Sequence, residues 1–192
     1  SHISEVTTWA DLNKRQLETL TNQLTKAVFK VETASTCNIC PQLDGAFNFY
    51  RDVMFTGDAT AIAADGDIVD MNVQGSVYLD QASLSGLDII RATDNIEIGG
   101  GAIIPELFSN ANIILKDGAY AGKASALGNV NLEPGNGSAG EIYANGDVLL
   151  NAGESSNVNA LGNVTANVNS HGDITAQGEI TINGGSFGNL SS

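Results

Sequence analysis

Two carboxylates stand at equivalent places in this chain, and paired carboxylates hydrolyse the glycosidic bond in most glycosidases. Glu141 and Asp173 each come just before a short apolar segment, and Asn157 stands at the same place between them. On stacked parallel strands about 4.8 Å apart, Glu141 and Asp173 would lie roughly 9.6 Å from each other. That separation is near the upper limit for an inverting pair. Because acids are common throughout the chain, this match is expected by coincidence, and we predict no catalytic residues.

The other residues that could take part in catalysis give no better constellation. His171 has no serine or cysteine partner at a recognisable spacing, and we predict that it is an exposed turn residue. Neutralising an acidic sugar would require Arg91, Lys116 and Lys123, which occupy dissimilar places in their repeats. The sequence therefore predicts a protein that is not an enzyme and that carries no cofactor.

A row of polar residues follows a recurrent glycine, and two interpretations of it are open. One is a cation site. The other is a ladder, in which stacked side chains hydrogen-bond to each other and to the backbone along a corner. Like charges stacked at strand spacing repel each other, and an asparagine separates the last two acids, which favours the ladder and no metal site. The members of the row are Asn129, Asp147, Asn163 and Glu179.

Cys37 and Cys40 form a Cys-Asn-Ile-Cys segment with three competing interpretations. A zinc site needs two more ligands, and the only histidines are His2 and His171. A thioredoxin-like motif needs its first cysteine at the start of a helix, whereas this pair follows a predicted helix. A local structural disulfide in an exported protein is favoured, and two cytosolic thiols are the alternative.

These residues are positioned by a short sequence motif that recurs along the chain and that we call the phrase. It reads Ile-Tyr-Ala-Asn-Gly-Asp-Val at 142–148, and related phrases end at residues 96, 113, 130, 164 and 180. The successive spacings are 17, 17, 18, 16 and 16 residues. Each phrase alternates apolar and polar residues on both sides of a glycine corner, which is typical of two half-buried strands. The intervening returns are too short for a helical crossover. We therefore predict an all-β fold, a parallel β-helix (solenoid) of about 16–18 residues per coil.

Two rows of apolar residues are expected to face the interior of this solenoid. One row is small and would lie where the tube is narrow, and the other is branched and would fill the wider part. The rows are Ala126, Ala144, Ala160 and Ala176, and Val130, Val148, Val164 and Ile180.

The front of the chain differs in kind, and we divide the protein at residue 43. Residues 1–43 are predicted to hold one amphipathic helix at 8–31 and the cysteine pair, and residues 44–192 the solenoid. The helix is too polar to span a bilayer. The aromatic segment 41–55 is predicted to cap the first coil together with the helix, because an open solenoid end exposes its apolar interior. The opening Ser-His is typical of a cleaved tag, which leaves room for an export signal or membrane anchor upstream.

Irregular segments interrupt the repeat. The phrases at 62–68 and 71–77 are too close together for separate coils and are interpreted as two sides of one larger coil. Residues 99–105 and 133–140 are predicted to be loops, the usual place for a binding surface on a rigid stack.

Charge is distributed unevenly between the two regions. The formal net charge of the chain is −14, yet residues 1–51 carry five basic and five acidic residues, so the excess of acid lies on the predicted solenoid. This acidic surface argues against binding to nucleic acid or to an anionic membrane.

The repeats resemble two families of known proteins. The segments Gly-Glu-Ile-Tyr-Ala-Asn-Gly-Asp-Val-Leu-Leu at 140–150 and Gly-Asp-Ile-Thr-Ala-Gln-Gly-Glu-Ile-Thr-Ile at 172–182 resemble bactofilin-type polymer-forming repeats. They are also similar to repeat regions of minor pilins and other type IV pilus-associated proteins, including those of mannose-sensitive haemagglutinin pili. The resemblance covers about residues 57–188 and implies a right-handed β-helix with a structural role.

The resemblance and the helix-first arrangement together lead to an expected function. We expect a structural protein of the bacterial envelope, extracellular or periplasmic, like a minor pilin that lacks its hydrophobic N-terminal half-helix. Its helix would contact protein subunits of a pilus or envelope assembly, and any membrane contact would come from a segment absent from this sequence. The alternatives are a cytoplasmic bactofilin-like scaffold that self-associates, and a surface protein that binds or cleaves carbohydrate.

Overall fold

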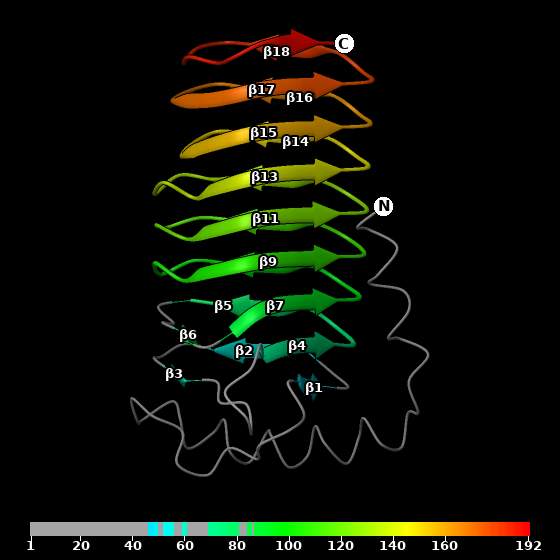
Figure 1. The fold of residues 1–192 in the computed structure, drawn as a ribbon, viewed down its shortest axis with the longest axis vertical. Coiled ribbons are helices and arrows are strands. Elements are labelled where there is room, and N and C mark those ends of the chain that lie inside the picture. The colour runs from blue at the N-terminus through cyan, green and yellow to red at the C-terminus, as the bar shows by residue number, and fades with distance from the viewer. Residues whose placement is uncertain (1–45, 50–51, 56–58, 61–68, 81–83, 86) are drawn as a thin grey trace.

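The computed structural model describes residues 46–49, 52–55, 59–60, 69–80, 84–85 and 87–192. These residues form an all-β parallel solenoid, whose strands stack one above the next along a single axis (Figure 1). The predicted fold class is therefore confirmed for this part of the chain. The predicted helix at 8–31, Cys37 and Cys40 lie outside the described residues. Within the described part, no helix has the length and apolar character needed to cross a membrane.

Two long parallel sheets make up the walls of the solenoid, and each coil contributes one strand to both. In the described chain, the first sheet contains β1 (Ala46–Phe49), β4 (Val69–Val73), β7 (Leu87–Ala92), β9 (Ile103–Ser109), β11 (Tyr120–Ala126), β13 (Ser138–Ala144), β15 (Glu154–Ala160), β17 (Ser170–Ala176) and β19 (Leu190–Ser191). The second contains β2 (Val53–Phe55), β5 (Val77–Leu79), β8 (Ile96–Ile98), β10 (Ile113–Leu115), β12 (Val130–Leu132), β14 (Val148–Leu150), β16 (Val164–Ala166) and β18 (Ile180–Ile182). A small side sheet pairs β3 (Ala59–Thr60) with β6 (Leu84–Ser85).

Both predicted interior rows exist in the structure. Val148 pairs in register with Val130 on one side and with Val164 on the other, and Val164 pairs with Ile180. The alanine row is superposed in the same way, from Ala126 to Ala176. Both rows are buried except that the final isoleucine is only partly covered. Both rows are buried because every second side chain of a strand points to the same face of the sheet, and these residues share the inner face.

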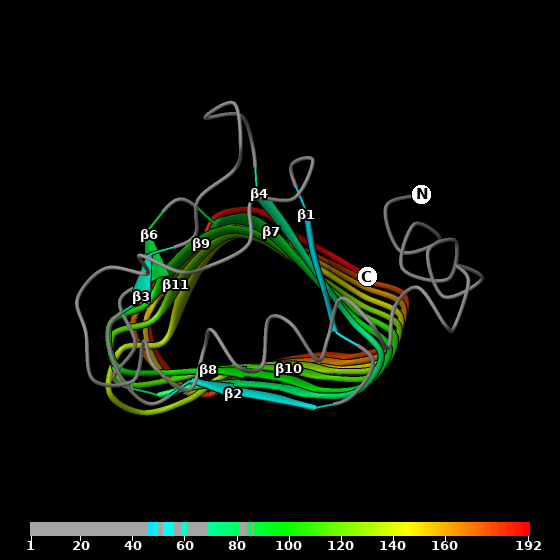
Figure 2. The ribbon, with the colours of Figure 1, turned by 90° about the horizontal axis from the view of Figure 1, so that it is seen from below.

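The long strands of the first sheet bend at a column of mostly glycine residues, a feature that the sequence analysis missed. The pairing of β11 with β13 skips the position of Gly122 and Gly140, and the pairing of β15 with β17 skips Gly172. A Cβ on Gly140 would overlap the carbonyl oxygen of Gly122 in the coil before. This bend gives the stacked coils a rounded triangular outline when they are viewed along the axis (Figure 2).

The loop predictions for 99–105 and 133–140 are wrong at their C-terminal ends. Ile103 opens β9 and Ser138 opens β13, so only residues 99–102 and 133–137 serve as returns between strands. The uneven repeat spacing arises in these returns. The spacing of 18 residues contains the return 133–137, and the spacings of 16 contain the shorter returns 151–153 and 167–169.

The aromatic segment contributes the first described coil. Strand β1 pairs with β4 and strand β2 pairs with β5, and Phe49 is buried at the end of β1. The phrase at 71–77 forms the next coil, whereas the phrase at 62–68 lies outside the described residues. The cap formed with the N-terminal helix stays a prediction, because the helix segment is not described.

Candidate functional site

The polar row along the corner forms a hydrogen-bonded ladder between coils. The Oδ1 atom of Asn129 accepts the backbone N–H of Asp147 at 2.8 Å, Asp147 accepts that of Asn163, and Asn163 accepts that of Glu179. The ladder interpretation is therefore confirmed, with bonds from side chain to backbone. Earlier coils continue it, since Asn112 accepts the N–H of Asn129 at 2.8 Å.

The recurrent glycine makes room for this ladder. A Cβ on Gly146 would overlap Oδ1 of Asn129 and would lie 2.9 Å from the carbonyl oxygen of Gly128. The corner glycine is thus needed for close approach between coils, which explains why a glycine precedes Asn129, Asp147, Asn163 and Glu179. The ladder satisfies backbone N–H groups at a place where the strands are interrupted.

A second ladder joins the short returns directly through side-chain amides, and the sequence analysis did not identify it. Asn167 Nδ2 donates to Asn151 Oδ1 at 2.5 Å, and Asn183 Nδ2 donates to Asn167 Oδ1 at 2.6 Å. The three asparagines stand 16 residues apart, at the first position of consecutive returns. Extending the repeat period from the phrases to the returns would have revealed them.

The predicted acid row is also superposed, but it contains a base. Glu141 pairs in register with Lys123 on one side and Asn157 on the other, and Asn157 pairs with Asp173. The carboxylate of Asp173 accepts the backbone N–H of Asn189 at 2.8 Å, so one oxygen has a structural task. Among the described residues, no three acids, histidines or cysteines come together as a metal site would require.

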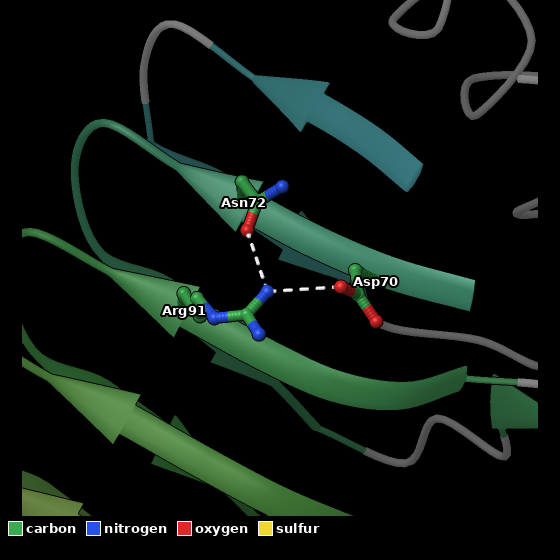
Figure 3. A network of polar contacts seen from close by, with 3 residues as sticks. All are labelled: Asp70, Asn72 and Arg91. Atoms are coloured by element: carbon green, nitrogen blue, oxygen red, sulfur yellow. Dashed lines mark hydrogen bonds and ion pairs between the residues drawn. The ribbon is translucent and has the colours of Figure 1, made fainter. Parts of the chain in front are cut away.

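The basic residues of the solenoid contact acids or rings of neighbouring coils. Arg91 on β7 donates to Asp70 at 2.9 Å and to Asn72 at 3.3 Å, both on β4 (Figure 3). Its guanidinium also lies 5.9 Å from the centroid of the Phe108 ring. The prediction that the bases occupy dissimilar places is confirmed, because Lys116 lies in a return.

Lys116 and Lys123 also contact acidic or aromatic side chains of other coils. Lys116 Nζ lies 3.0 Å from Glu97 Oε1 and 5.4 Å from the centroid of the Tyr78 ring. The hydrogen bond with Glu97 is the main reason why the pKa of Lys116 is raised. Lys123 Nζ lies 5.4 Å from the centroid of the Tyr143 ring. Each base therefore stabilises contact between coils, and the outer surface retains its acidic character.

His171 is buried, and its prediction as an exposed turn residue is wrong. Only 4% of His171 is exposed, and the residue lies in β17. Its Nε2–H donates to the carbonyl oxygen of Val168 at 2.9 Å, which leaves Nδ1 to accept the hydroxyl of Ser155 at 2.8 Å. Ser155 precedes His171 by 16 residues, one coil period, and the two pair in register. They continue the interior column that holds Ala139 in the coil before Ser155.

This buried histidine predicts a dependence of stability on pH. Burial lowers the pKa of His171, against smaller opposing effects of the Val168 carbonyl and the Glu154 charge. The unfolded chain therefore takes up the proton more readily. The stability contribution is fully present above a pH of about 6.5 and is lost as the pH falls below that value, toward the lower pKa of the folded state. The slope should reach at most about 1.4 kcal/mol per pH unit.

The measurement is urea unfolding followed by circular dichroism between pH 7.5 and pH 5. The double variant Ser155→Ala/His171→Ala, which extends the alanines of this column, should lose less stability over the same range. Equal pH dependence in both proteins would contradict the assignment.

Two buried serines offer a matched comparison of hydrogen bonding. Ser109 and Ser125 are both fully buried. Ser109 donates to the carbonyl of Asp94 at 2.7 Å and accepts the N–H of Ala111 at 2.9 Å. The hydroxyl of Ser125, in contrast, has no hydrogen-bond partner among the described residues. A buried hydroxyl without a hydrogen-bond partner lowers the stability of the folded protein. Removing a hydroxyl that has partners also lowers stability, because the buried groups it leaves behind become unsatisfied.

We expect Ser125→Ala to leave the free energy of unfolding unchanged or to raise it. We expect Ser109→Ala to lower it by about 1–3 kcal/mol. Urea titrations of the two variants side by side test this, and a larger loss in Ser125→Ala than in Ser109→Ala would contradict it.

Comparisons of the chain with protein-family models, with curated proteins and with solved structures found no match. The resemblance to bactofilin-type repeats and to pilus-associated proteins therefore rests on the repeat phrases themselves. What the structure establishes is a parallel β-solenoid whose coils are joined by superposed apolar rows and polar ladders.

Proposed function

We propose that this protein is a non-enzymatic structural component whose solenoid is a stiff, acidic rod. The observation that carries the proposal is the parallel pairing of neighbouring coils, which keeps one register from β9 to β18 and shifts only at Val69 and Asp70 among the described pairings. The interior rows and the corner ladder connect successive coils, and the return ladder adds bonds between the last three returns of this kind. Because the interior rows and the corner ladder repeat along one axis, bending the rod would disturb many bonds at once. Such a rod suits a spacer or a display surface.

We further propose that the rod belongs to the bacterial envelope, as a minor pilin-like or other pilus-associated protein. The amphipathic segment 8–31 would pack into an assembly of pilus subunits, the solenoid would be right-handed, and Cys37 and Cys40 would form a disulfide. These points are supported by the repeat resemblance and by the order of helix, cysteine pair and solenoid in the sequence.

Fractionation of the source bacterium tests this assignment. The expected result is recovery of the native protein with sheared surface appendages, together with a Cys37–Cys40 disulfide detected by mass spectrometry without reduction. A cytosolic pool with two free thiols would contradict the envelope assignment and would leave the rod itself intact.

A bactofilin-like scaffold is the second candidate, and the C-terminal end of the described solenoid favours it. Strands β18 and β19 form the edges of the two sheets at this end. Phe187 is 37% exposed and Leu190 is 45% exposed, and Ile180 and Ile182 are only partly buried. Sheet edges beside apolar side chains are templates for pairing, either with another chain or with a further coil.

Electron microscopy of the full chain and of a variant without residues 1–43 separates the two candidates. Filaments in both preparations would favour the scaffold, and filaments in neither would favour the pilus-associated rod. Leu190→Asp should abolish any filaments that form through this end, whereas Leu161→Asp, at an exposed corner position, should not.

A further inference from the structure

A polar groove runs over the returns, along the axis of the solenoid. Its volume is about 670 Å³, within the range typical of small-ligand sites. The first residues of three successive long strands, Ser138, Glu154 and Ser170, line it together with Ser186, which forms an isolated bridge with Ser170 in the next coil. Ser138 bonds to the backbone of Glu154, and Glu154 pairs with Ser170. The groove is therefore a product of the repeat, with one polar side chain contributed by each coil.

The unequal length of the returns creates this depression. The return 133–137 is longer than the returns 151–153 and 167–169, so it projects further from the stack (Figure 1). Asn136, in the longer return, lines one end of the groove. Both Asn136 and Asn169 have positive φ, of 65° and 70°. These left-handed turns reverse the chain sharply beside the groove, and asparagine is one of the few residues that adopts them readily.

An exposed tyrosine stands beside the N-terminal end of the groove. Tyr120 pairs in register with Ser138 and therefore stands one coil before it in the same column. Its side chain leans across β13, because a Cβ on Gly140 would lie 3.2 Å from the Tyr120 hydroxyl. The residue is nevertheless 42% exposed. Tyr120 does not line the groove itself, but its column continues through Ser138 into the row of groove-lining hydroxyl and carboxylate groups.

The chemistry of this row selects a ligand rich in hydroxyl groups. Glu154 supplies acceptors, and the exposed hydroxyls of Ser170 and Ser186 supply donors and acceptors. Neither lysine nor arginine lines the groove among the described residues, and the solenoid is strongly acidic, so a phosphate or an acidic sugar would be repelled. Coils about 4.8 Å apart present equivalent groups at intervals similar to the length of one sugar unit.

We propose that this groove binds a linear glycan, neutral or with amino groups, whose sugar units follow the solenoid axis. The ring of Tyr120 stacks on one sugar face, and Glu154, Ser170 and Ser186 hydrogen-bond to the hydroxyl groups of the following units. This inference is independent of the proposed envelope location, since it depends only on the groove.

Nuclear magnetic resonance of the isotope-labelled full chain tests the proposal. The probes are hexamers of cellulose, xylan, mannan, chitin and chitosan, with oligogalacturonate as an acidic probe. At least one neutral or amino hexamer should shift the amide signals of Ser138, Glu154 and Ser170. Tyr120→Ala should weaken that binding by about tenfold, equivalent to about 1.4 kcal/mol, whereas Tyr120→Phe should retain it.

A blocking variant and its control complete the test. Ser170→Phe should fill the groove and abolish binding, while Thr165→Phe, on the outer face of the other sheet, should bind like the unaltered chain. The proposal is overturned if no hexamer binds, if only oligogalacturonate binds, or if Ser170→Phe binds as well as Thr165→Phe. Calcium ions alone causing the same signal shifts would also overturn it, because the groove would then be a cation site.

Discussion

Val148→Asp should destabilise the solenoid by at least about 4 kcal/mol, a loss comparable with the whole stability of many small domains. Val148 is 1% exposed and lies between Val130 and Val164 in the interior row. A carboxylate at this place would be surrounded by hydrocarbon and would have no cation to pair with, because the neighbouring interior residues are apolar. The lost packing of the valine adds to that cost.

The neighbouring residue supplies the matched control. Leu149 is adjacent in sequence, but its side chain points outward, beside those of Asn131 and Thr165. Leu149→Asp should therefore change the free energy of unfolding by less than about 1 kcal/mol. Urea unfolding of both variants, followed by circular dichroism, measures the difference. Equal losses, or a larger loss for Leu149→Asp, would mean that the interior has been assigned to the wrong face.

Gly172→Ala should cost about 2–3 kcal/mol or more, for a purely steric reason. Gly172 belongs to the glycine column at the bend, and its φ lies outside the left-handed region. A Cβ there would overlap the carbonyl oxygen of Ser156 in the preceding coil. Because that oxygen belongs to the backbone of a packed strand, neither atom can move without disturbing the ladder between the coils.

A second glycine separates this steric effect from conformational strain. Gly101 has φ of +75°, and a Cβ there would meet no atom of the described part of the chain within 4 Å. Gly101→Ala should cost only about 1–2 kcal/mol, from the left-handed backbone. Gly101→Asn should keep most of the stability that Gly101→Ala loses, because Asn136 and Asn169 already adopt such φ values. Gly172→Asn, in contrast, should be at least as destabilising as Gly172→Ala. Rescue of Gly172 by asparagine would contradict the steric explanation.

The parts of the fold that the sequence could predict are those that repeat with strict alternation. The valine and alanine rows and the corner ladder follow from one phrase, because parallel strands of equal register superpose equivalent residues. The bend was missed because the repeat was defined by its corner glycine alone, whereas Gly122, Gly140 and Gly172 permit close approach of backbones within a strand. Similarly, Ile103 and Ser138 were assigned to loops because glycine and proline lie nearby.

The candidate site was harder to predict because its parts come from different coils. His171 gave no signal when only sequence motifs for catalysis were considered, yet Ser155 stands one period before it. The asparagines at 151, 167 and 183 have the same spacing. Predicting the groove would have required knowing which returns are short, and the length of a return depends on where the next strand begins. The acidic column was predicted correctly in register, but the sequence did not place Lys123 within it.

The central claim is that equivalent residues of successive coils are superposed along one axis, and distances between spin labels measure this most directly. The second sheet orders its strands from β18 to β2, and Thr181, Ile114, Tyr78 and Met54 occupy one outward column of it. Backbone distances from Thr181 should therefore be about 19 Å to Ile114, about 29 Å to Tyr78 and about 34 Å to Met54, a rise of about 4.8 Å per coil. A series that fails to increase with coil number, or that shortens between the last two pairs, would contradict the solenoid.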